Sequence, residues 1–186
     1  LNNVLIAPPY LIVLSIAFAV GAILYTNITL FMNISGAHFN PAVTFMMYLR
    51  GKINQSDALI YSILQILGGI LGVIFTHLMF EENIFSISNI DRSSNFLIIA
   101  ELLATSGLLI VIAVAEKKNP EKIPATVGLF IMSATLFTSS TCFANPAVTL
   151  SRIFTDSGVG IDPYSALLFF VSQLVCAFIV SKIIEN

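Results

Sequence analysis

The sequence has no tryptophan and few charged residues: Asp, Glu, Lys and Arg make up only 10% of its 186 residues. Soluble proteins carry about 25% charged residues, so this chain lacks the side chains that would cover a protein in water. Residues 1–49 contain no charge, and neither do residues 123–151. Because 57% of the residues are hydrophobic, we expect an all-α integral membrane protein with the lipid bilayer as its surroundings.

Other absences exclude several classes of function. The net charge is −2, so no basic surface points to nucleic acid as a partner. The two cysteines, Cys142 and Cys176, lie inside apolar segments and suggest neither a disulfide framework nor a zinc site. No nucleophile–base pair or cluster of metal ligands is recognisable. We therefore expect no enzyme, no cofactor and no bound metal.

Five apolar segments are candidates for membrane spans. A span needs about 20 apolar residues, and the candidates are residues 9–32, 58–80, 95–115, 124–138 and 163–183. Cytoplasmic loops are enriched in Lys and Arg. One of the two orientations places six of the eight basic residues on the cytoplasmic side: Arg50, Lys52, Lys117, Lys118, Lys122 and Lys182. Arg92 and Arg152 then lie on the outer side.

The pentapeptide NPAVT occurs twice, at residues 40–44 and 145–149. Three predicted spans separate the copies, so the two copies enter the membrane from opposite faces. This pattern is an inverted repeat, which places a site near the middle of the membrane. Broken backbone is tolerated at that depth where it is buried in protein or lines a water-filled cavity.

Each copy predicts the start of a half-helix. Asn is a good N-cap and Pro is favourable in the first turn, so the half-helices begin at Asn40 and Asn145. Their positive dipole ends and Asn amides would meet at one point, repel cations and bind a neutral oxygen-bearing solute. The motif residues are Asn40, Pro41, Ala42, Asn145, Pro146 and Ala147. Backbone carbonyls near Gly36, Ala37, His38, Thr141, Cys142 and Phe143 would supply the acceptors.

These motifs resemble the aquaporin and aquaglyceroporin family, the major intrinsic proteins. The similar stretches are SGAHFNPAVT (35–44), ANPAVTLSR (144–152), ELLAT (101–105) and QILGGILG (65–72). The resemblance implies a homotetramer with one pore per subunit and passive conduction of water or small uncharged solutes. It also implies six spans and two half-helices. This chain offers five spans. The missing one is the first helix of the first repeat, because the position in that helix that corresponds to Glu101 falls before Leu1.

The chain thus resembles a family member without its first helix. We expect a single channel domain over residues 1–186, made of a truncated first repeat (1–80) and a second repeat (95–186). The resemblance also implies that Glu101 is a structural carboxylate that accepts backbone N–H bonds from the second NPAVT loop. His38 is expected to be a packed loop histidine, with a gate as the alternative.

The selectivity filter departs from the family pattern. Family members usually carry Arg three positions after the second motif Asn, where this chain has Val148. Counting along the sequence assigns the other filter positions to Val20, Cys142 and either Ser133 or Thr135. This set is small and apolar, so we expect a broader pore for water, glycerol-like polyols, urea or metalloid acids such as arsenous acid.

Two other functions remain open. Ion-coupled secondary transporters also use broken helices, but such a mechanism needs carboxylates in the membrane and only Glu101 is available. The absent helix leaves a non-conducting structural protein of the same fold as a further alternative. The stretch SRIFTDSGVGI (151–161) is similar to a bacterial or archaeal branch of the family and implies a prokaryotic inner membrane.

Overall fold

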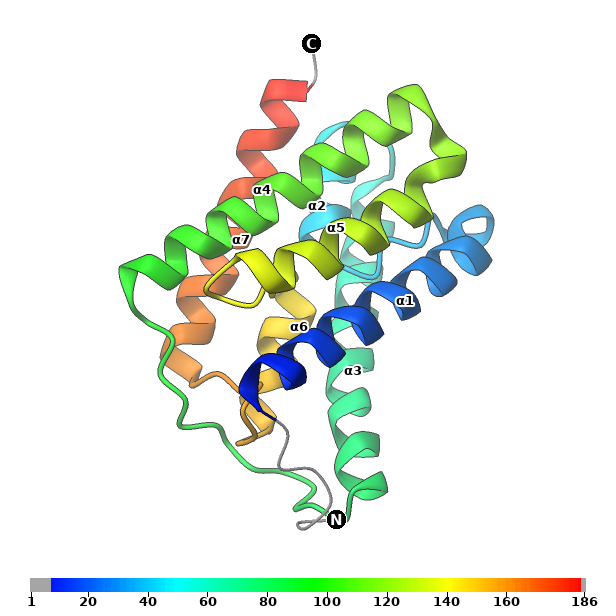
Figure 1. The fold of residues 1–186 in the computed structure, drawn as a ribbon. Coiled ribbons are helices and arrows are strands. Elements are labelled where there is room, and N and C mark those ends of the chain that lie inside the picture. The colour runs from blue at the N-terminus through cyan, green and yellow to red at the C-terminus, as the bar shows by residue number, and fades with distance from the viewer. Residues whose placement is uncertain (1–7, 185–186) are drawn as a thin grey trace.

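The computed structural model describes residues 8–184, which form a bundle of helices (Figure 1). The α-helices of this part of the chain are α1 (Pro9–Ser35), α2 (Pro41–Leu49), α3 (Gln55–Met79), α4 (Asn95–Lys118), α5 (Ile123–Phe137), α6 (Pro146–Ser151) and α7 (Pro163–Ile184). Two short 3₁₀ helices, η1 (Pro120–Lys122) and η2 (Arg152–Phe154), precede α5 and follow α6. The predicted all-α membrane fold is confirmed, and the long helices agree with the predicted spans to within a few residues.

The long helices differ in their capacity to cross a bilayer. In the described residues, α1, α3, α4 and α7 are long and apolar enough to span it. Helix α5 has 15 residues, which corresponds to about 22 Å of helix. The turn of η1 directly before α5 continues it toward the predicted cytoplasmic side.

The exterior of the bundle is apolar, and its buried interior includes many small residues. Phe96 and Leu103 of α4 are 81% and 62% exposed, as expected for side chains that face lipid. Ala17, Ala104 and Ala177, by contrast, are completely buried. Small residues at helix interfaces let the backbones approach closely, which is how helices pack where water does not drive association.

The two halves of the chain pack as an inverted pair. Helix α1 contacts α5, α2 contacts α7 and α3 contacts α6. Figure 1 shows α1 and α5 side by side, running in opposite directions. Helix α4 packs against α7 and α5, whereas no helix in residues 8–184 occupies the corresponding place beside α3 and α1. The repeat boundaries at residues 1–80 and 95–186 remain predictions.

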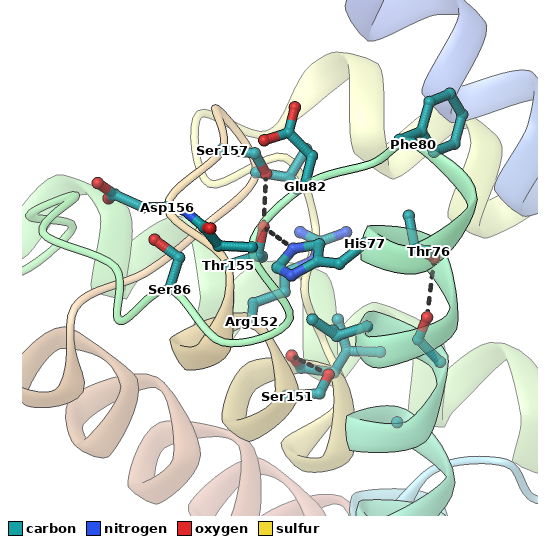
Figure 2. Close-up of a pocket in the computed structure, with 16 residues that line it drawn as sticks. Thr76, His77, Phe80, Glu82, Ser86, Ser151, Arg152, Thr155, Asp156 and Ser157 are labelled. Carbon is teal, nitrogen blue, oxygen red and sulfur yellow. Dashed lines mark hydrogen bonds between the residues drawn. The ribbon is translucent and has the colours of Figure 1, made fainter.

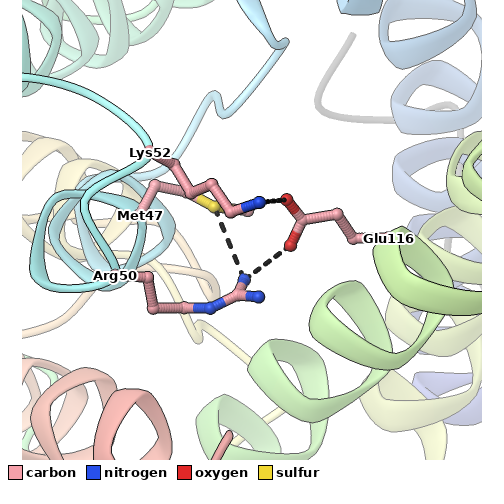
Figure 3. A network of polar contacts seen from close by, with 4 residues as sticks. All are labelled: Met47, Arg50, Lys52 and Glu116. Atoms are coloured by element: carbon pink, nitrogen blue, oxygen red, sulfur yellow. Dashed lines mark hydrogen bonds and ion pairs between the residues drawn. The ribbon is translucent and has the colours of Figure 1, made fainter. Parts of the chain in front are cut away.

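A charged cluster ties two helix ends together on the predicted cytoplasmic side (Figure 3). Glu116, near the end of α4, bridges Arg50 Nη1 at 2.6 Å and Lys52 Nζ at 3.3 Å. Arg50 Nη1 also lies 3.8 Å from the sulfur of Met47 in α2. The cluster therefore fixes the end of the half-helix α2 against a membrane-spanning helix.

Candidate functional site

Both half-helices begin at the Asn-Pro pairs of the repeated motif. Asn40 Oδ1 accepts the backbone N–H of Ala42 at 2.9 Å, and Asn145 Oδ1 accepts that of Ala147 at the same distance. Asn145 Oδ1 also accepts the N–H of Val148 at 3.4 Å. The Asn oxygens thus satisfy helix N–H groups that lack partners inside the helix, while Pro at the first position removes another.

The Asn amide groups join the two halves of the chain. Asn40 Nδ2 donates a hydrogen bond of 2.7 Å to the carbonyl of Ala144, and Asn145 Nδ2 donates one of 2.9 Å to the carbonyl of Phe39. An amide NH₂ group carries two protons, so each Asn retains a second donor. The reciprocal pair holds the N-termini of α2 and α6 face to face.

The loops before the half-helices share an unusual backbone. Positive φ angles occur at Gly36, Ala37 and Phe39 in the first loop. They recur 105 residues later at Thr141 (60°), Cys142 (52°) and Ala144 (45°). Left-handed conformations at non-Gly residues cost on the order of 1–3 kcal/mol each and persist only when surrounding contacts hold them. The match of all three positions shows that both loops are folded in the same way.

Glu101 of α4 supplies such contacts for the second loop. The carboxylate is completely buried. One oxygen accepts the N–H of Phe143 at 3.1 Å and the hydroxyl of Ser140 at 3.0 Å. The other accepts the N–H of Ala144 at 2.7 Å and Nε2 of Gln173 at 2.6 Å. A buried carboxylate with four donors is a rigid clamp on this loop.

The first loop has no equivalent clamp in the described residues. The corresponding backbone amides are those of His38 and Phe39, and within residues 8–184 neither N–H finds an acceptor. Gln65 Nε2 donates to Thr44 Oγ1 at 3.0 Å, as Gln173 does to Thr149 at 2.9 Å. The glutamine–threonine pair is therefore repeated in both halves, whereas the carboxylate is present beside the second loop alone.

A cavity of about 340 Å³, the central cavity, lies where the half-helices meet. Its lining includes both motif asparagines and most of the predicted filter and loop residues: Val20, Gly36, Ala37, His38, Asn40, Cys142, Phe143, Asn145 and Val148. Pro41, Ala42, Pro146 and Ala147 lie behind this surface in the buried turns of α2 and α6. Thr141 is half-buried and is not among the lining residues.

Helix α5 presents a different face to the central cavity than counting along the sequence predicted. Val127 and Ile131 line the cavity, and neither Ser133 nor Thr135 does. Ser133 is exposed on the outside of the bundle. Thr135 is buried one turn beyond Ile131 and donates its hydroxyl to the Ile131 carbonyl at 2.8 Å. Residues four apart share a helix face and residues two apart do not, so the structure corrects the assignment of Ser133.

His38 packs within its loop and also borders the central cavity. Its Nδ1 lies 3.1 Å from Thr44 Oγ1, and its ring meets that of Tyr61 edge-on at 5.8 Å. Two neighbours on different helices therefore fix the ring, as expected for a packed loop histidine.

Two further cavities adjoin the central one. An outer cavity of about 750 Å³ lies between α3, η2 and the following loop (Figure 2). A lateral cavity of about 420 Å³ lies along α3, beside Gln65, Gly68 and Gly69. Val148 is thus part of the wall of all three cavities.

Sequence reasoning did not assign a role to two residues of the outer cavity. His77 Nε2 lies 2.9 Å from Thr155 Oγ1 (Figure 2). His77 Nδ1 lies 3.1 Å from the carbonyl of Ile84. Arg152 lines both the outer and the central cavity. The available signal for Arg152 was its spacing, because it follows Val148 by four residues, or about one helical turn.

Comparison with known proteins agrees with this geometry. The family model described as Major intrinsic protein matches residues 5–143. Aquaglyceroporin AqpS of Rhizobium meliloti (strain 1021) is 40% identical over 162 residues, which cover 86% of this chain and 70% of that protein. Aquaporin TIP1-2 of Musa acuminata is 31% identical over 143 residues, which cover 72% of this chain and 56% of that protein.

One further relative matches a shorter part of the chain. Aquaporin PIP2-1 of Arabidopsis thaliana is 44% identical over 63 residues, or 34% of this chain and 22% of the plant protein. The family match and the rhizobial relative together extend over most of the chain. The chain therefore belongs to the major intrinsic protein family, whose aquaporins are channels and not enzymes.

Proposed function

We propose that the chain conducts small uncharged solutes passively across a membrane. The observation that carries this proposal is the central cavity, in which two half-helix N-termini and two Asn amides face each other. Membership of a channel family supports the same conclusion.

The electrostatics of the central cavity favour neutral solutes. The N-terminus of a helix carries about +0.5 charge, so two converging N-termini repel cations. Among the described residues that line the cavity, none is Asp or Glu, and Arg152 carries the charge. An ion-coupled transporter needs a titratable or cation-binding group at this depth. Glu101 does not provide one, because its oxygens are already bonded to the second loop.

The solute class follows from the lining. Val20, Ile131 and Val148 make the walls largely apolar, while the Asn amides and loop carbonyls supply hydrogen bonds. Such a lumen suits water, glycerol-like polyols, urea and uncharged metalloid acids such as arsenous acid. The word aquaglyceroporin in the name of the rhizobial relative supports a polyol. We further propose a homotetramer in a prokaryotic inner membrane.

A second candidate is a non-conducting structural membrane protein of the same fold. The lateral cavity favours it, because this cavity reaches Asn145 and Val148 from the side of α3. A lumen that is open to lipid on one side would not guide a solute along a single path. The two candidates differ in a direct measurement of permeability.

The test is reconstitution in liposomes with stopped-flow light scattering. Water, glycerol, urea and arsenous acid are imposed in turn as osmolytes. A conducting protein raises permeability above that of bare lipid for at least one of them. The matched control is Val148→Phe, which places a ring where the three cavities meet and should lower the flux. If every permeability equals that of bare lipid, the protein is not a channel.

A further inference from the structure

Val148 and Arg152 are the two described residues shared by the central and outer cavities. They lie about one turn apart, Val148 within α6 and Arg152 at the start of η2. A solute that passes from one cavity to the other must move past these two side chains. Arg152 therefore places a positive charge in the shared wall of both cavities, about one turn after Val148, which stands where the family usually has Arg.

The guanidinium of Arg152 is held by an aromatic ring and leaves its donors free. Its Cζ atom lies 4.3 Å from the centroid of the Phe143 ring. Phe143 is itself fixed, because its ring meets Phe169 edge-on at 5.4 Å and its N–H binds Glu101. No hydrogen bond or ion pair of the Arg152 guanidinium occurs in residues 8–184. A guanidinium carries five N–H donors of fixed geometry, and Arg152 lines both cavities.

Arg92 provides an internal comparison. Its Cζ lies 5.2 Å from the centroid of the same Phe143 ring. Its side chain, however, donates to the carbonyls of Gly160 at 2.9 Å and Gly158 at 3.2 Å. Arg92 is also absent from the residues that line the cavities. Of the two arginines on Phe143, one is thus tied to a loop and the other faces the solute path.

The carboxylates of the outer cavity do not neutralise Arg152. Glu82 and Asp156 line this cavity, but neither forms an ion pair with Arg152 in the described part of the chain. Asp156 Oδ1 instead accepts the N–H of Asn89 at 2.9 Å. The Arg152 guanidinium therefore forms no ion pair in the described part of the chain. The buried carboxylate of Glu101, whose charge acts on Arg152, is already bonded to four other donors. A positive charge without an ion-pair partner is what a barrier to cations requires.

We propose that Arg152 is the selectivity residue of this channel. It repels cations at the junction of the two cavities, and it donates hydrogen bonds to oxygen-bearing neutral solutes there. The charge that Val148 does not provide is thus supplied one helical turn further along the chain. This inference rests on the proposed channel function and adds to it the residue that excludes ions.

The experiment measures neutral and ionic permeability separately in the same liposomes. Glycerol flux is followed by light scattering, and proton flux by an entrapped pH-sensitive dye under a potassium diffusion potential. Arg152→Met keeps an unbranched side chain but removes the charge, Arg152→Gln keeps amide donors without charge, and Arg152→Lys keeps the charge. Arg92→Met is the matched control because it removes the other cation on Phe143.

We expect Arg152→Met and Arg152→Gln to raise proton flux by about tenfold or more while glycerol still permeates. Arg152→Lys and Arg92→Met should keep the low proton flux of the wild type. The double substitution Val148→Arg/Arg152→Met moves the charge back by one turn and should restore the barrier. Arg152→Gln covers the case in which Arg152→Met does not fold, which size-exclusion chromatography would reveal.

Unchanged proton flux in both uncharged variants, with glycerol permeation intact, would overturn the role of Arg152 and leave the channel proposal standing. Equal increases in Arg92→Met and Arg152→Met would also overturn it, since the effect would then come from Phe143. A wild type without glycerol or water permeability above bare lipid overturns both proposals together.

Discussion

Gly21 of α1 and Gly128 of α5 lie against each other where the two helices cross. A Cβ atom on Gly21 would come within 2.8 Å of the Gly128 carbonyl oxygen, and one on Gly128 would come equally close to the Gly21 carbonyl. The contact is reciprocal, as expected at the axis that relates the two halves. Because α1 and α5 also contribute Val20 and Ile131 to the central cavity, this crossing sets the spacing of two of its walls.

The crossing of α1 and α5 should not tolerate a larger residue at Gly128. Gly128→Ala should lower the free energy of unfolding by about 1–3 kcal/mol, because the methyl group meets backbone that cannot move aside easily. Thermal unfolding in detergent measures the effect as a lower Tm. Gly68→Ala in α3 is the control, because a Cβ there has nothing within 4 Å. Equal Tm values for Gly128→Ala and the wild type would contradict the prediction.

Glu101→Gln tests the clamp on the second loop. The new amide group turns two donor protons toward groups that are themselves donors, so at least one buried N–H loses its acceptor. Such a loss costs about 1–3 kcal/mol, and we expect a lower Tm together with reduced glycerol flux. Glu116→Gln is a useful comparison, since its partly exposed ion pairs with Arg50 and Lys52 are worth less than about 1 kcal/mol. A larger effect at Glu116 than at Glu101 would refute the assignment.

Cys142 should be the site at which mercurials block the channel. Its side chain borders the central cavity, so a mercury adduct on its sulfur would occupy the lumen. Cys176 is 2% exposed, donates its thiol to the Leu102 carbonyl at 3.4 Å and does not line that cavity. Solute flux should therefore become resistant in Cys142→Ser and stay sensitive in Cys176→Ser. Inhibition that persists in Cys142→Ser would assign the block to another site.

Asp162 should make stability depend on pH in the acid range. Burial alone would raise the pKa of this carboxyl, but hydrogen bonds from Ser165 and from the Tyr164 amide outweigh it and hold the pKa below its ordinary value of 3.8. A lowered folded-state pKa means that the stabilisation is complete above the unfolded pKa. It is lost as the pH falls through the folded value.

The Asp162→Asn variant measures this contribution. The Tm difference between wild type and variant should be constant from about pH 5 to 7 and shrink below about pH 4. Asp57, which follows the N-cap of α3, offers a comparison at another helix start through Asp57→Asn. A Tm difference between wild type and Asp162→Asn that grows as the pH falls would contradict a lowered pKa of Asp162 in the folded protein.

Much of the site could be predicted from local sequence. Asn-Pro sets the start of a half-helix because the cap and the ring act within one turn, and Asn40 and Asn145 do cap α2 and α6. The hydrogen-bond partners of Glu101 could not be predicted from the local sequence. Its four donors come from Ser140, Phe143, Ala144 and Gln173, up to 72 residues away, and it was family resemblance that suggested the contact.

The sequence by itself determined that the protein lies in a lipid bilayer, where its spans are, and where its two half-helices begin. It also indicated that the half-helices enter the membrane from opposite faces. Hydropathy and capping allow this because they are properties of short segments. Tertiary structure decided which side chains meet. It placed Ile131 rather than Ser133 at the cavity, because the rotation of α5 is set by its packing against α1. It also joined each Asn amide to the opposite loop and brought Arg152 over Phe143 at the junction of two cavities. Such contacts depend on how separate helices pack, and no local pattern encodes that packing.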